Sequence, residues 1–413
     1  MNHSHELPHR NKPKPRAVIV GGSIAGVSCA HALILAGWQV VVIEKSRRPP
    51  KGNPTGAGLA LDPLSQELIG SWTGRPELLH DITSPLPIDL NQAINDEKTR
   101  KILARDEKFN HSAAHWAALH DHLFSALPPE IFLDKQSVKI RARVLDTEET
   151  VELDGDLLVA ADGSHSLIRH HYFPDLKLRY SGYYAWRGVL DFAGIEDSDT
   201  IKNVREAHPE LGKCLYFDLA PGNHTILFEI PNKRLNWVWF LNQPEPHLKG
   251  NSLTMKVSDE MIQKMYQDAE KIWHPTLVQV MRETKEPFVN AIYDCDPLER
   301  IVWDNVVLVG DAAHPTTPHC ARSTNMSILD AAVLGRCLEK WGPENIMAAL
   351  EEYQSIRLPV ASKQVLHARR VGRIKQGLEL PDCKPFNPNT ANWEECKMLQ
   401  LRAVPFFGHN PLL

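Results

Sequence analysis

The sequence predicts an α/β protein in which a domain with a parallel sheet is interleaved with a second domain built on an antiparallel β-sheet. Apolar runs typical of buried parallel strands begin near residues 17, 157 and 306, and each ends in a turn rich in glycine or aspartate. Between residues 180 and 245 the pattern changes to strand-like runs separated by tight turns such as Pro221-Gly222-Asn223, which is typical of antiparallel strands.

The N-terminal part gives the clearest succession of elements. Ala17–Val20 is a short β-branched run, residues 24–36 have helical spacing, and Trp38–Ile43 is a second strand that ends at Glu44. Residues 46–56 are basic and rich in proline and glycine, which predicts a loop. The other parallel-type strands are expected at 157–163 and 306–309, and the other helices at 113–127, 254–285, 323–339 and 345–373.

Composition narrows the function classes. A chain of 413 residues with 43% hydrophobic residues is long enough for two domains, and a net charge of -5 favours neither nucleic acid nor an anionic membrane as a partner. The seven cysteines are scattered without metal-ligand spacing, so we expect reduced thiols and no metal site. Residues 17–43 carry no Asp, Glu, Lys or Arg, but Gly21-Gly22-Ser23 interrupts them, so we expect no membrane span. We therefore expect a soluble, cytoplasmic protein.

The first strand runs into a glycine-rich turn. Gly21, Ser23 and Gly26 occupy the three positions of G-x-G-x-x-G between a strand and a helix, and Glu44 ends the next strand. In such a turn small residues let the backbone approach a pyrophosphate, which the helix N-terminus stabilises, while the acid accepts hydrogen bonds from ribose hydroxyls. This context predicts dinucleotide binding, although serine replaces the central glycine.

Two further strands end in an acidic turn. Asp162-Gly163 follows the strand in LLVAADGSHSLIR, and Gly310-Asp311 follows the strand in VVLVGDAAHP. Each motif alone is most simply a turn, because Asp and Gly are common turn residues. Together they place two carboxylates at the carboxyl ends of parallel strands, where open α/β sheets bind ligands.

The three motifs, in this order, resemble those of the class A FAD-dependent aromatic hydroxylases, the family of para-hydroxybenzoate hydroxylase, over about residues 16–375. GGSIAG, YYAWRG, LNWVWF and AIYD are similar to the subgroup that includes 2,6-dihydroxypyridine 3-monooxygenase. The resemblance implies a Rossmann-like FAD-binding domain, reduction by NADPH or NADH, and O2 as co-substrate. It also implies oxygen insertion, through a flavin hydroperoxide, into a phenolic or N-heteroaromatic small molecule, and a homodimer.

The resemblance assigns roles to individual residues. The glycine turn and Glu44 would hold the ADP half of FAD, the Asp-Gly turn would serve FAD and the nicotinamide, and Asp311 would bind the ribityl chain. The family often has glycine where this chain has Ala321, Arg322 and Ser323, so we expect an altered backbone approach to the flavin. The expected FAD-binding residues are Gly21, Gly22, Ser23, Gly26, Glu44, Arg47, Arg48, Gly58, Asp162, Gly163, Gly310, Asp311, Ala321, Ser323, Thr324 and Asn325.

Three residues are candidates for contact with the reacting ring. By the resemblance, the backbone of Pro318 lies beside the reactive edge of the flavin. His319 is a candidate base, although a histidine in a loop is more often a structural hydrogen-bonding residue. His314 is a weaker candidate for the same role. Tyr216 would either face the ring and move a proton or pack in the core, and packing is slightly favoured.

The resemblance also suggests an interleaved domain order. We expect a polar tail at 1–16, FAD-binding segments at 17–85, 111–170 and 291–375, substrate-domain segments at 86–110 and 171–290, and a C-terminal tail at 376–413.

Other functions remain open at this point. The same fold supports epoxidation, oxidative decarboxylation and dehydrogenation, because these differ only in the pocket. A non-catalytic flavin-binding protein is favoured by the changed loop at 320–323 and opposed by the intact Glu44, Asp162 and Asp311. A pure NAD dehydrogenase leaves Gly310-Asp311 unexplained.

Overall fold

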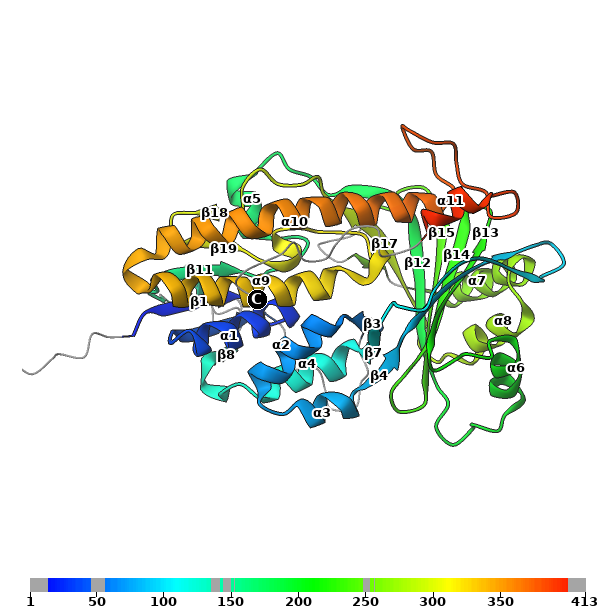
Figure 1. Ribbon diagram of the computed structural model, residues 1–413, viewed down its shortest axis with the longest axis horizontal. Helices are drawn as coiled ribbons and strands as arrows, with labels where there is room; N and C mark the ends of the chain where they lie inside the picture. The colour runs from blue at the N-terminus through cyan, green and yellow to red at the C-terminus, as the bar shows by residue number, and fades with distance from the viewer. Residues whose placement is uncertain are drawn as a thin grey trace, which may run out of the picture.

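The computed structural model describes residues 14–45, 56–134, 142–143, 150–151, 153–247, 253–255 and 257–399. Arg47 and Arg48, expected near the pyrophosphate, lie outside the described residues. Figure 1 shows a parallel sheet with its helices at one end of the molecule and a large sheet at the other. The helix α10 (Ile346–Lys375, orange) runs along both halves.

A six-stranded sheet carries the three sequence motifs. Its strands, in spatial order, are β18 (Val302–Trp303), β19 (Val306–Leu308), β11 (Leu157–Ala160), β1 (Arg16–Val20), β2 (Gln39–Glu44) and β8 (Phe132–Asp134). All neighbouring pairs are parallel except β18–β19. Because Val20 pairs with Ala160 and Ala160 with Leu308, the turns after β1, β11 and β19 lie side by side at one edge.

Two helices cover this sheet closely. The helix α1 (Ile24–Leu35) is apolar on nearly every side, and it packs against α9 (Ser323–Trp341). The contact needs Gly335, since an added Cβ there would lie 2.9 Å from the Cβ of Ala32. This packing holds the N-terminal ends of α1 and α9 in fixed positions beside the motif turns.

A mixed eight-stranded sheet forms the other half. Its strands, in spatial order, are β16 (Thr254–Met255), β17 (Phe288–Asp294), β12 (Arg179–Asp191), β15 (Arg234–Asn242), β14 (Asn223–Ile230), β13 (Cys214–Ala220), β5 (Ile88–Ile94) and β6 (Arg100–Asp106). Only β13 and β5 pair in parallel. The two sheets confirm the predicted combination of a parallel sheet with a mainly antiparallel one.

The two faces of the large sheet have different neighbours. One face packs against α6 (Asp199–Ala207), α7 (Asp259–Ile272) and α8 (Pro275–Glu283) through a core that includes Trp186, Trp237 and Trp239. The opposite face turns its side chains toward a cavity described below. Successive residues of a strand therefore point alternately to the helical core and to the cavity.

Smaller elements connect the halves. A three-stranded sheet has β7 (His111–His115) between β3 (Gly58–Leu61) and β4 (Thr83–Leu86). The short pair is β9 (Ala142–Arg143) with β10 (Thr150–Val151). The remaining helices are α2 (Pro63–Thr73), α3 (Pro76–Asp81), α4 (Trp116–Ser125), α5 (Leu167–Tyr172) and α11 (Trp393–Lys397), with 3-10 turns at Pro129–Ile131, Gly310–Ala312, His319–Ala321 and Pro343–Asn345.

Two helix predictions are wrong in their limits. Residues 113–115 belong to the strand β7, because its backbone pairs with both β3 and β4, and the helix begins at Trp116. The expected helix at 254–285 is wrong at its start, where Thr254–Met255 form β16 and α7 begins at Asp259. It is also divided, since Trp273 has extended backbone angles and Pro275 begins α8. The domain boundaries stay a prediction, although β5 and β6, from the segment 86–110, do join the large sheet.

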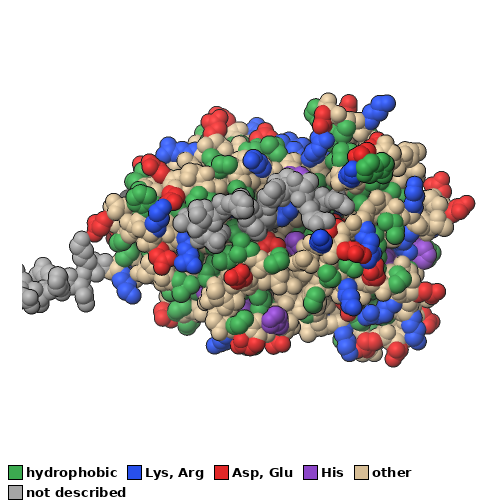
Figure 2. Space-filling view, in the orientation of Figure 1, with side chains coloured by type: hydrophobic (Ala, Val, Ile, Leu, Met, Phe, Trp, Pro, Cys, Tyr) green, Lys and Arg blue, Asp and Glu red, His purple; other side chains and the backbone are tan. Residues whose placement is uncertain are grey.

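The surface carries both signs of charge. On the face drawn in Figure 2, Lys and Arg side chains are interspersed with Asp and Glu. Within the described part of the chain, no helix combines the length and the apolar character that crossing a membrane requires.

Candidate active site

Glycines at two positions, one in the turn after β1 and one in the first turn of α1, allow close contacts of the backbone. Gly21 has a φ of +104°, and an added Cβ would lie 2.2 Å from the carbonyl oxygen of Ala161. An added Cβ at Gly26 would lie 1.8 Å from the carbonyl oxygen of Gly21. Ser23 is the N-cap of α1 without capping through its side chain, and the first turn of the helix holds no acidic residue. The N–H groups at this helix end can therefore receive an anion.

Glu44 lies beside this turn. Its Oε2 accepts a hydrogen bond of 2.7 Å from the backbone N–H of Gly22. An added Cβ at Gly22 would lie 3.1 Å from the Cβ of Glu44, so the strand end and the turn are in close contact. The carboxylate is thus held at the end of β2, next to the N-terminus of α1, as the motif predicts.

The two acidic turns are joined to each other. Asp311 accepts hydrogen bonds from the hydroxyls of Ser323 at 2.7 Å and Ser164 at 3.2 Å. The buried guanidinium of Arg169 donates to the carbonyls of Asp311 and Ala312, each at 3.0 Å, and to that of Ser164. The parallel pairing of β11 with β19 brings these groups together, and Arg169 fixes their spacing.

Asp162 keeps one acceptor atom available. Its Oδ2 accepts a hydrogen bond of 2.9 Å from the backbone N–H of Leu167, whereas its Oδ1 is buried and makes no hydrogen bond within the described part of the chain. An unpaired buried carboxylate oxygen is costly unless a ligand donates to it. This atom, the tight glycine turn and the free end of α1 fit the hydroxyl and pyrophosphate groups of FAD.

A cavity of about 560 Å³ lies between the loop before α9 and the large sheet. The loop from Pro318 to Thr324 forms one side, together with Gly58 and its neighbours on β3. The backbone N–H of Gly58 donates to Oδ1 of Asn236 at 2.7 Å, which fastens β3 to the sheet. The sheet side of the cavity is mainly apolar and is lined by Leu215, Phe217, Ile226, Phe228, Val238, Phe240 and Phe288.

The loop before α9 has an unusual backbone. Cys320 has a φ of 71° and Ala321 a φ of 53°, a region that favours glycine. Asn325, fully buried, anchors the loop: its Nδ2 donates to the carbonyls of Ala321 at 2.7 Å and Ala60 at 2.9 Å, and its Oδ1 accepts from the backbone N–H of Asp62. Ser323 and Thr324 place the N-terminus of α9 at the cavity.

We expect Ala321→Gly to stabilise the protein by about 0.5–1 kcal/mol. A left-handed alanine costs roughly 1–2 kcal/mol relative to glycine, and the greater freedom of glycine in the unfolded chain offsets part of that gain. Ala332→Gly, in the middle of α9, is the matched control and should destabilise the protein by about 1 kcal/mol. Urea unfolding followed by tryptophan fluorescence measures both, and equal signs for the two variants would contradict the strain at Ala321.

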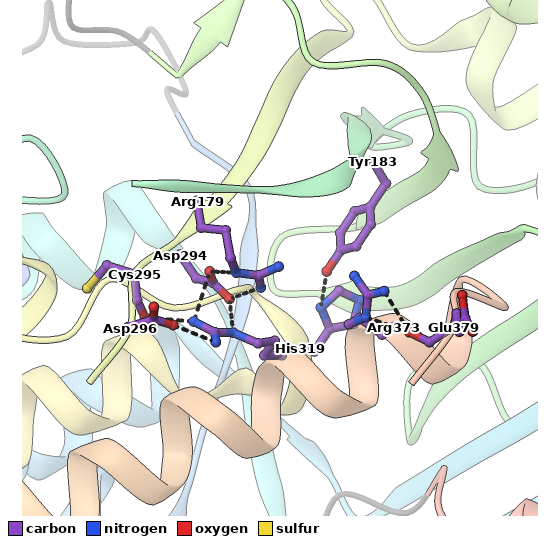
Figure 3. Close-up of polar contacts among 9 residues, drawn as sticks. Arg179, Tyr183, Asp294, Cys295, Asp296, His319, Arg373 and Glu379 are labelled. Carbon is purple, nitrogen blue, oxygen red and sulfur yellow. Dashed lines mark hydrogen bonds and ion pairs between the residues drawn. The ribbon is translucent and has the colours of Figure 1, made fainter. Parts of the chain in front are cut away.

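His319 lines the cavity and is neutral. Its Nδ1 lies 3.5 Å from the hydroxyl of Tyr183, and Figure 3 shows the Tyr183 ring pointing at the imidazole beside α10. Burial lowers the pKa of His319 well below its usual value, and the charges of nearby groups, Lys375 and Arg187 among them, lower it further. Its Nε2 is buried without a hydrogen-bond partner in the described part of the chain. A role as base stays a proposal.

The structure contradicts one of the two alternatives for Tyr216, that its side chain faces the ring. Its hydroxyl accepts a hydrogen bond of 2.9 Å from the backbone N–H of Glu210, and its side chain lies in the core beneath α6–α8. Its neighbours Leu215 and Phe217 line the cavity instead. Tyr216 therefore packs, which was the favoured alternative.

His314 is part of a buried ion cluster. Its Nε2 lies 2.6 Å from Oδ2 of Asp330, which also accepts from the backbone N–H of Gly310 at 2.8 Å. Oδ1 of Asp330 accepts from Nε of Arg357 at 2.8 Å. The cluster holds the Gly310-Asp311 turn against α9 and α10, so His314 has a structural position.

Sequence reasoning missed several residues of the site. Arg169 and Ser164 stand inside the quoted motif LLVAADGSHSLIR, but only the parallel pairing of the strands shows that they hold Asp311. Asn236 and Arg187 stand in the quoted strand patterns LNWVWF and YYAWRG. Their polar side chains among apolar neighbours are a signal that could have marked them.

Comparison with known proteins shows the family of this chain. The family described as "FAD binding domain" matches residues 130–368, more than half of the chain. The 6-hydroxynicotinate 3-monooxygenase of Pseudomonas fluorescens is 24% identical over 370 residues, which cover 84% of this chain and 89% of that protein. The 2,6-dihydroxypyridine 3-monooxygenase of Paenarthrobacter nicotinovorans is 25% identical over 371 residues, 83% of this chain and 87% of that protein.

Solved structures share the fold. The 2,6-dihydroxypyridine-3-hydroxylase from Arthrobacter nicotinovorans superposes with a TM-score of 0.74 at 20% identity, covering 91% of this chain and 96% of that one. The HpxO protein of Klebsiella pneumoniae, solved with FAD and uric acid, gives a TM-score of 0.70 at 21% identity, covering 88% and 89%. These findings confirm the resemblance read from the three motifs: the chain belongs to the FAD binding domain family.

Proposed function

We propose that this protein is an NAD(P)H-dependent FAD monooxygenase that inserts one oxygen atom of O2 into a phenolic or N-heteroaromatic small molecule. The observation that carries the proposal is a mainly apolar cavity of about 560 Å³ at the N-terminus of α9, lined by Ser323, whose hydroxyl also donates to Asp311. A cavity of this size suits a single aromatic ring beside a flavin ring. Relatives named for hydroxynicotinate and dihydroxypyridine support the same class of substrate.

Different residues would bind different parts of FAD. The N-terminus of α1 and the glycine turn would receive the pyrophosphate, Glu44 would accept from the ribose, and Asp311 and Oδ1 of Asp162 would accept from hydroxyls. Bound FAD supplies the hydride acceptor and the activation of O2. The N-terminus of α9 presents its positive end to the cavity and would stabilise negative charge on the reduced ring.

The cavity walls position the substrate and keep water away. Phenylalanine and aliphatic side chains cover the sheet side, and a dry site protects reactive species from hydrolysis. Nε2 of His319 is a polar atom without a protein partner in the described part of the chain, and we assign it to a hydroxyl of the substrate ring. The backbone of Pro318 borders the same space.

We also propose a cellular location and an oligomeric state. We place it in the cytoplasm as a homodimer, supported by the family resemblance and by seven free cysteines. Epoxidation and dehydrogenation on the same fold are less favoured, because the relatives named above are monooxygenases of pyridine rings. Oxidative decarboxylation stays an alternative, because position 3 of 6-hydroxynicotinate carries the carboxylate.

The first test is reduction of the bound flavin by NADPH or NADH without oxygen, alone and with a panel of phenols and hydroxypyridines. We expect one ring class to accelerate the loss of the visible flavin band at least about tenfold, since substrate-gated reduction uses binding energy to assemble the site. Single-oxygen products under air complete the test. Flavin that no ring compound makes reducible would contradict the proposal, as would a protein that holds no flavin.

A further inference from the structure

A second cavity, of about 660 Å³, is lined by the C-terminal half of α10, the first residue of β12 and the loop after α10. Four arginines from two elements that are far apart in the sequence belong to this lining, and we call the cavity the arginine cleft. Its lining residues are Arg179, Leu366, Arg369, Arg370, Arg373, Glu379, Leu380 and Pro381. The cavity beside the loop before α9 shares none of these described residues, so the cleft is a separate space.

The spacing of the residues on α10 brings three of the arginines to one face. Arg369 and Arg370 follow Leu366 by three and four residues, and Arg373 follows Arg369 by four. Like charges at this spacing repel each other, although the negative end of the α10 dipole offsets part of that cost. The dipole does not account for Arg179, which reaches the same space from the large sheet.

Carboxylates pair with three of these arginines from outside the lining. Arg179 and Arg369 share the buried carboxylate of Asp294, at 2.7 and 2.9 Å, and Figure 3 shows Arg179 and Asp294 in contact beside α10. Arg370 pairs with Asp382 at 2.8 Å. Neither carboxylate is among the residues that line the cleft. The ion pairs therefore hold the guanidinium groups in place and leave the lining itself positive.

Arg373 has the least compensation of the four arginines. Its Nε and Nη2 donate to the backbone carbonyl of Glu379 at 3.0 and 2.6 Å, as Figure 3 shows, and no described Asp or Glu forms an ion pair with it. Among the described residues of the lining, Glu379 is the only acid. Four guanidinium groups thus face one carboxylate, and a concave space with such an excess of charge attracts anions.

Two hydrogen bonds connect the cleft with the chain segment that leads to the active site. Nη2 of Arg369 donates to the carbonyl of Cys295 at 3.0 Å, and the backbone N–H of Cys295 donates to the carbonyl of Pro315 at 3.3 Å. Pro315 stands three residues before Pro318, which lines the cavity beside α9. The cleft therefore lies close to the loop of the active site.

We propose that the arginine cleft binds a phosphate group of a small molecule. A phosphate presents several charged oxygens to several guanidinium groups at once, and the planar fork of arginine matches its geometry. Leu366, Leu380 and Pro381 add an apolar border to the charged lining. Two sources share this chemistry, namely the phosphates of the reductant NADPH or NADH and a free anion such as pyrophosphate.

Calorimetric titration of the FAD-loaded protein with sodium pyrophosphate, at constant ionic strength, tests the site itself. We expect saturable binding of one anion. Arg373→Gln should weaken this binding about tenfold, because it removes a charge-assisted hydrogen bond. Glu379→Gln should strengthen it about threefold, because it removes a solvent-exposed charge that repels the anion. A damaged fold would not produce this gain.

Two further variants serve as controls. Arg373→Lys keeps the charge but loses the planar fork, so it should recover only part of the affinity. Arg336→Gln removes an exposed charge of the same sign on α9, outside the cleft, and should leave the binding of pyrophosphate unchanged.

Reduction of the flavin without oxygen identifies the source of the phosphate. If the reductant occupies the cleft, pyrophosphate and Arg373→Gln should each raise its half-saturating concentration about tenfold at an unchanged maximal rate. An effect on NADPH alone would assign the cleft to the phosphate that NADH lacks. If neither affects reduction while calorimetry detects binding that depends on Arg373, the ligand is a free anion.

The inference is wrong if neither the binding of pyrophosphate nor the half-saturating concentration of the reductant depends on Arg373. Calorimetry needs no turnover, so this result is distinct from a failure of the proposed function. A protein whose flavin no reductant reduces would contradict the proposed function alone, and the binding of pyrophosphate would still decide whether the cleft is an anion site.

Discussion

We expect the substitution of Gly26 by alanine to abolish the retention of FAD. This is the largest effect on cofactor binding that the structure predicts. The new Cβ would lie 1.8 Å from the carbonyl oxygen of Gly21, so the turn must open or α1 must move away from β1. Either movement displaces the N–H groups that receive the pyrophosphate. The ratio of flavin to protein absorbance after purification, and titration of FAD into the flavin-free protein, measure the loss.

Gly70→Ala is the matched control for this change. Gly70 is also a buried helical glycine, but an added Cβ would meet only Pro76 at an ordinary 3.4 Å. This variant should hold FAD normally and be slightly more stable, because alanine favours a helix. Circular dichroism checks that Gly26→Ala is folded. A folded Gly26→Ala protein that retains its yellow colour would show that the turn does not contact the cofactor.

Asp330→Ala is expected to have the largest effect on stability. The substitution leaves the buried Arg357 without its carboxylate and removes the acceptor of the Gly310 N–H. Breaking a buried pair from one side costs about 3–5 kcal/mol. Urea unfolding at pH 7 measures the loss, and Glu339→Ala, which breaks an exposed pair with Arg336 on the same helix, should cost less than about 1 kcal/mol.

The contribution of Asp330 to the stability of the fold is expected to decrease at low pH. Its charged and hydrogen-bonded partners hold the pKa of Asp330 at about 2 against the cost of burial, below the value of the unfolded chain. The carboxylate therefore stabilises the fold above about pH 4 and loses this contribution as the pH falls toward 2. Linkage gives about 2–3 kcal/mol for the full titration, and about half is gone by pH 3. A gap between the variant and the unmodified protein that stays constant from pH 7 to pH 3 would contradict this assignment.

The ligand-binding edge of the parallel sheet was predictable because interactions between residues close in the sequence determine its strands and turns. A strand of β-branched residues, a tight glycine turn and a strand-end carboxylate each leave a short sequence pattern. Parallel pairing then brings the turns together without further information, as it does for Gly21, Asp162 and Asp311.

The residues that line the substrate cavity were less predictable, because contacts between residues distant in the sequence determine which side chains face it. β13 is buried on both faces, so its sequence does not alternate between polar and apolar residues, and nothing local shows that Tyr216 faces α6–α8. Ala113 and Ala114 favour a helix by propensity, yet pairing with two strands overrides it. Arg187 stands in the pattern YYAWRG, but only the pairing of β12 with β15 and β17 shows that it lines the cavity with Val238 and Phe288.

The helix α10 has a consequence for how far related chains can diverge. Arg357 ties one part of it to the Gly310 turn through Asp330, and farther along Gly372 leaves room for Tyr183 and His319, which an added Cβ would approach to 2.5 and 2.7 Å. Each helical residue adds about 1.5 Å and a rotation of roughly 100°. One inserted or deleted residue between Arg357 and Gly372 would therefore turn one contact away from its target. Homologues that preserve both contacts should tolerate many substitutions in this segment while keeping its length unchanged.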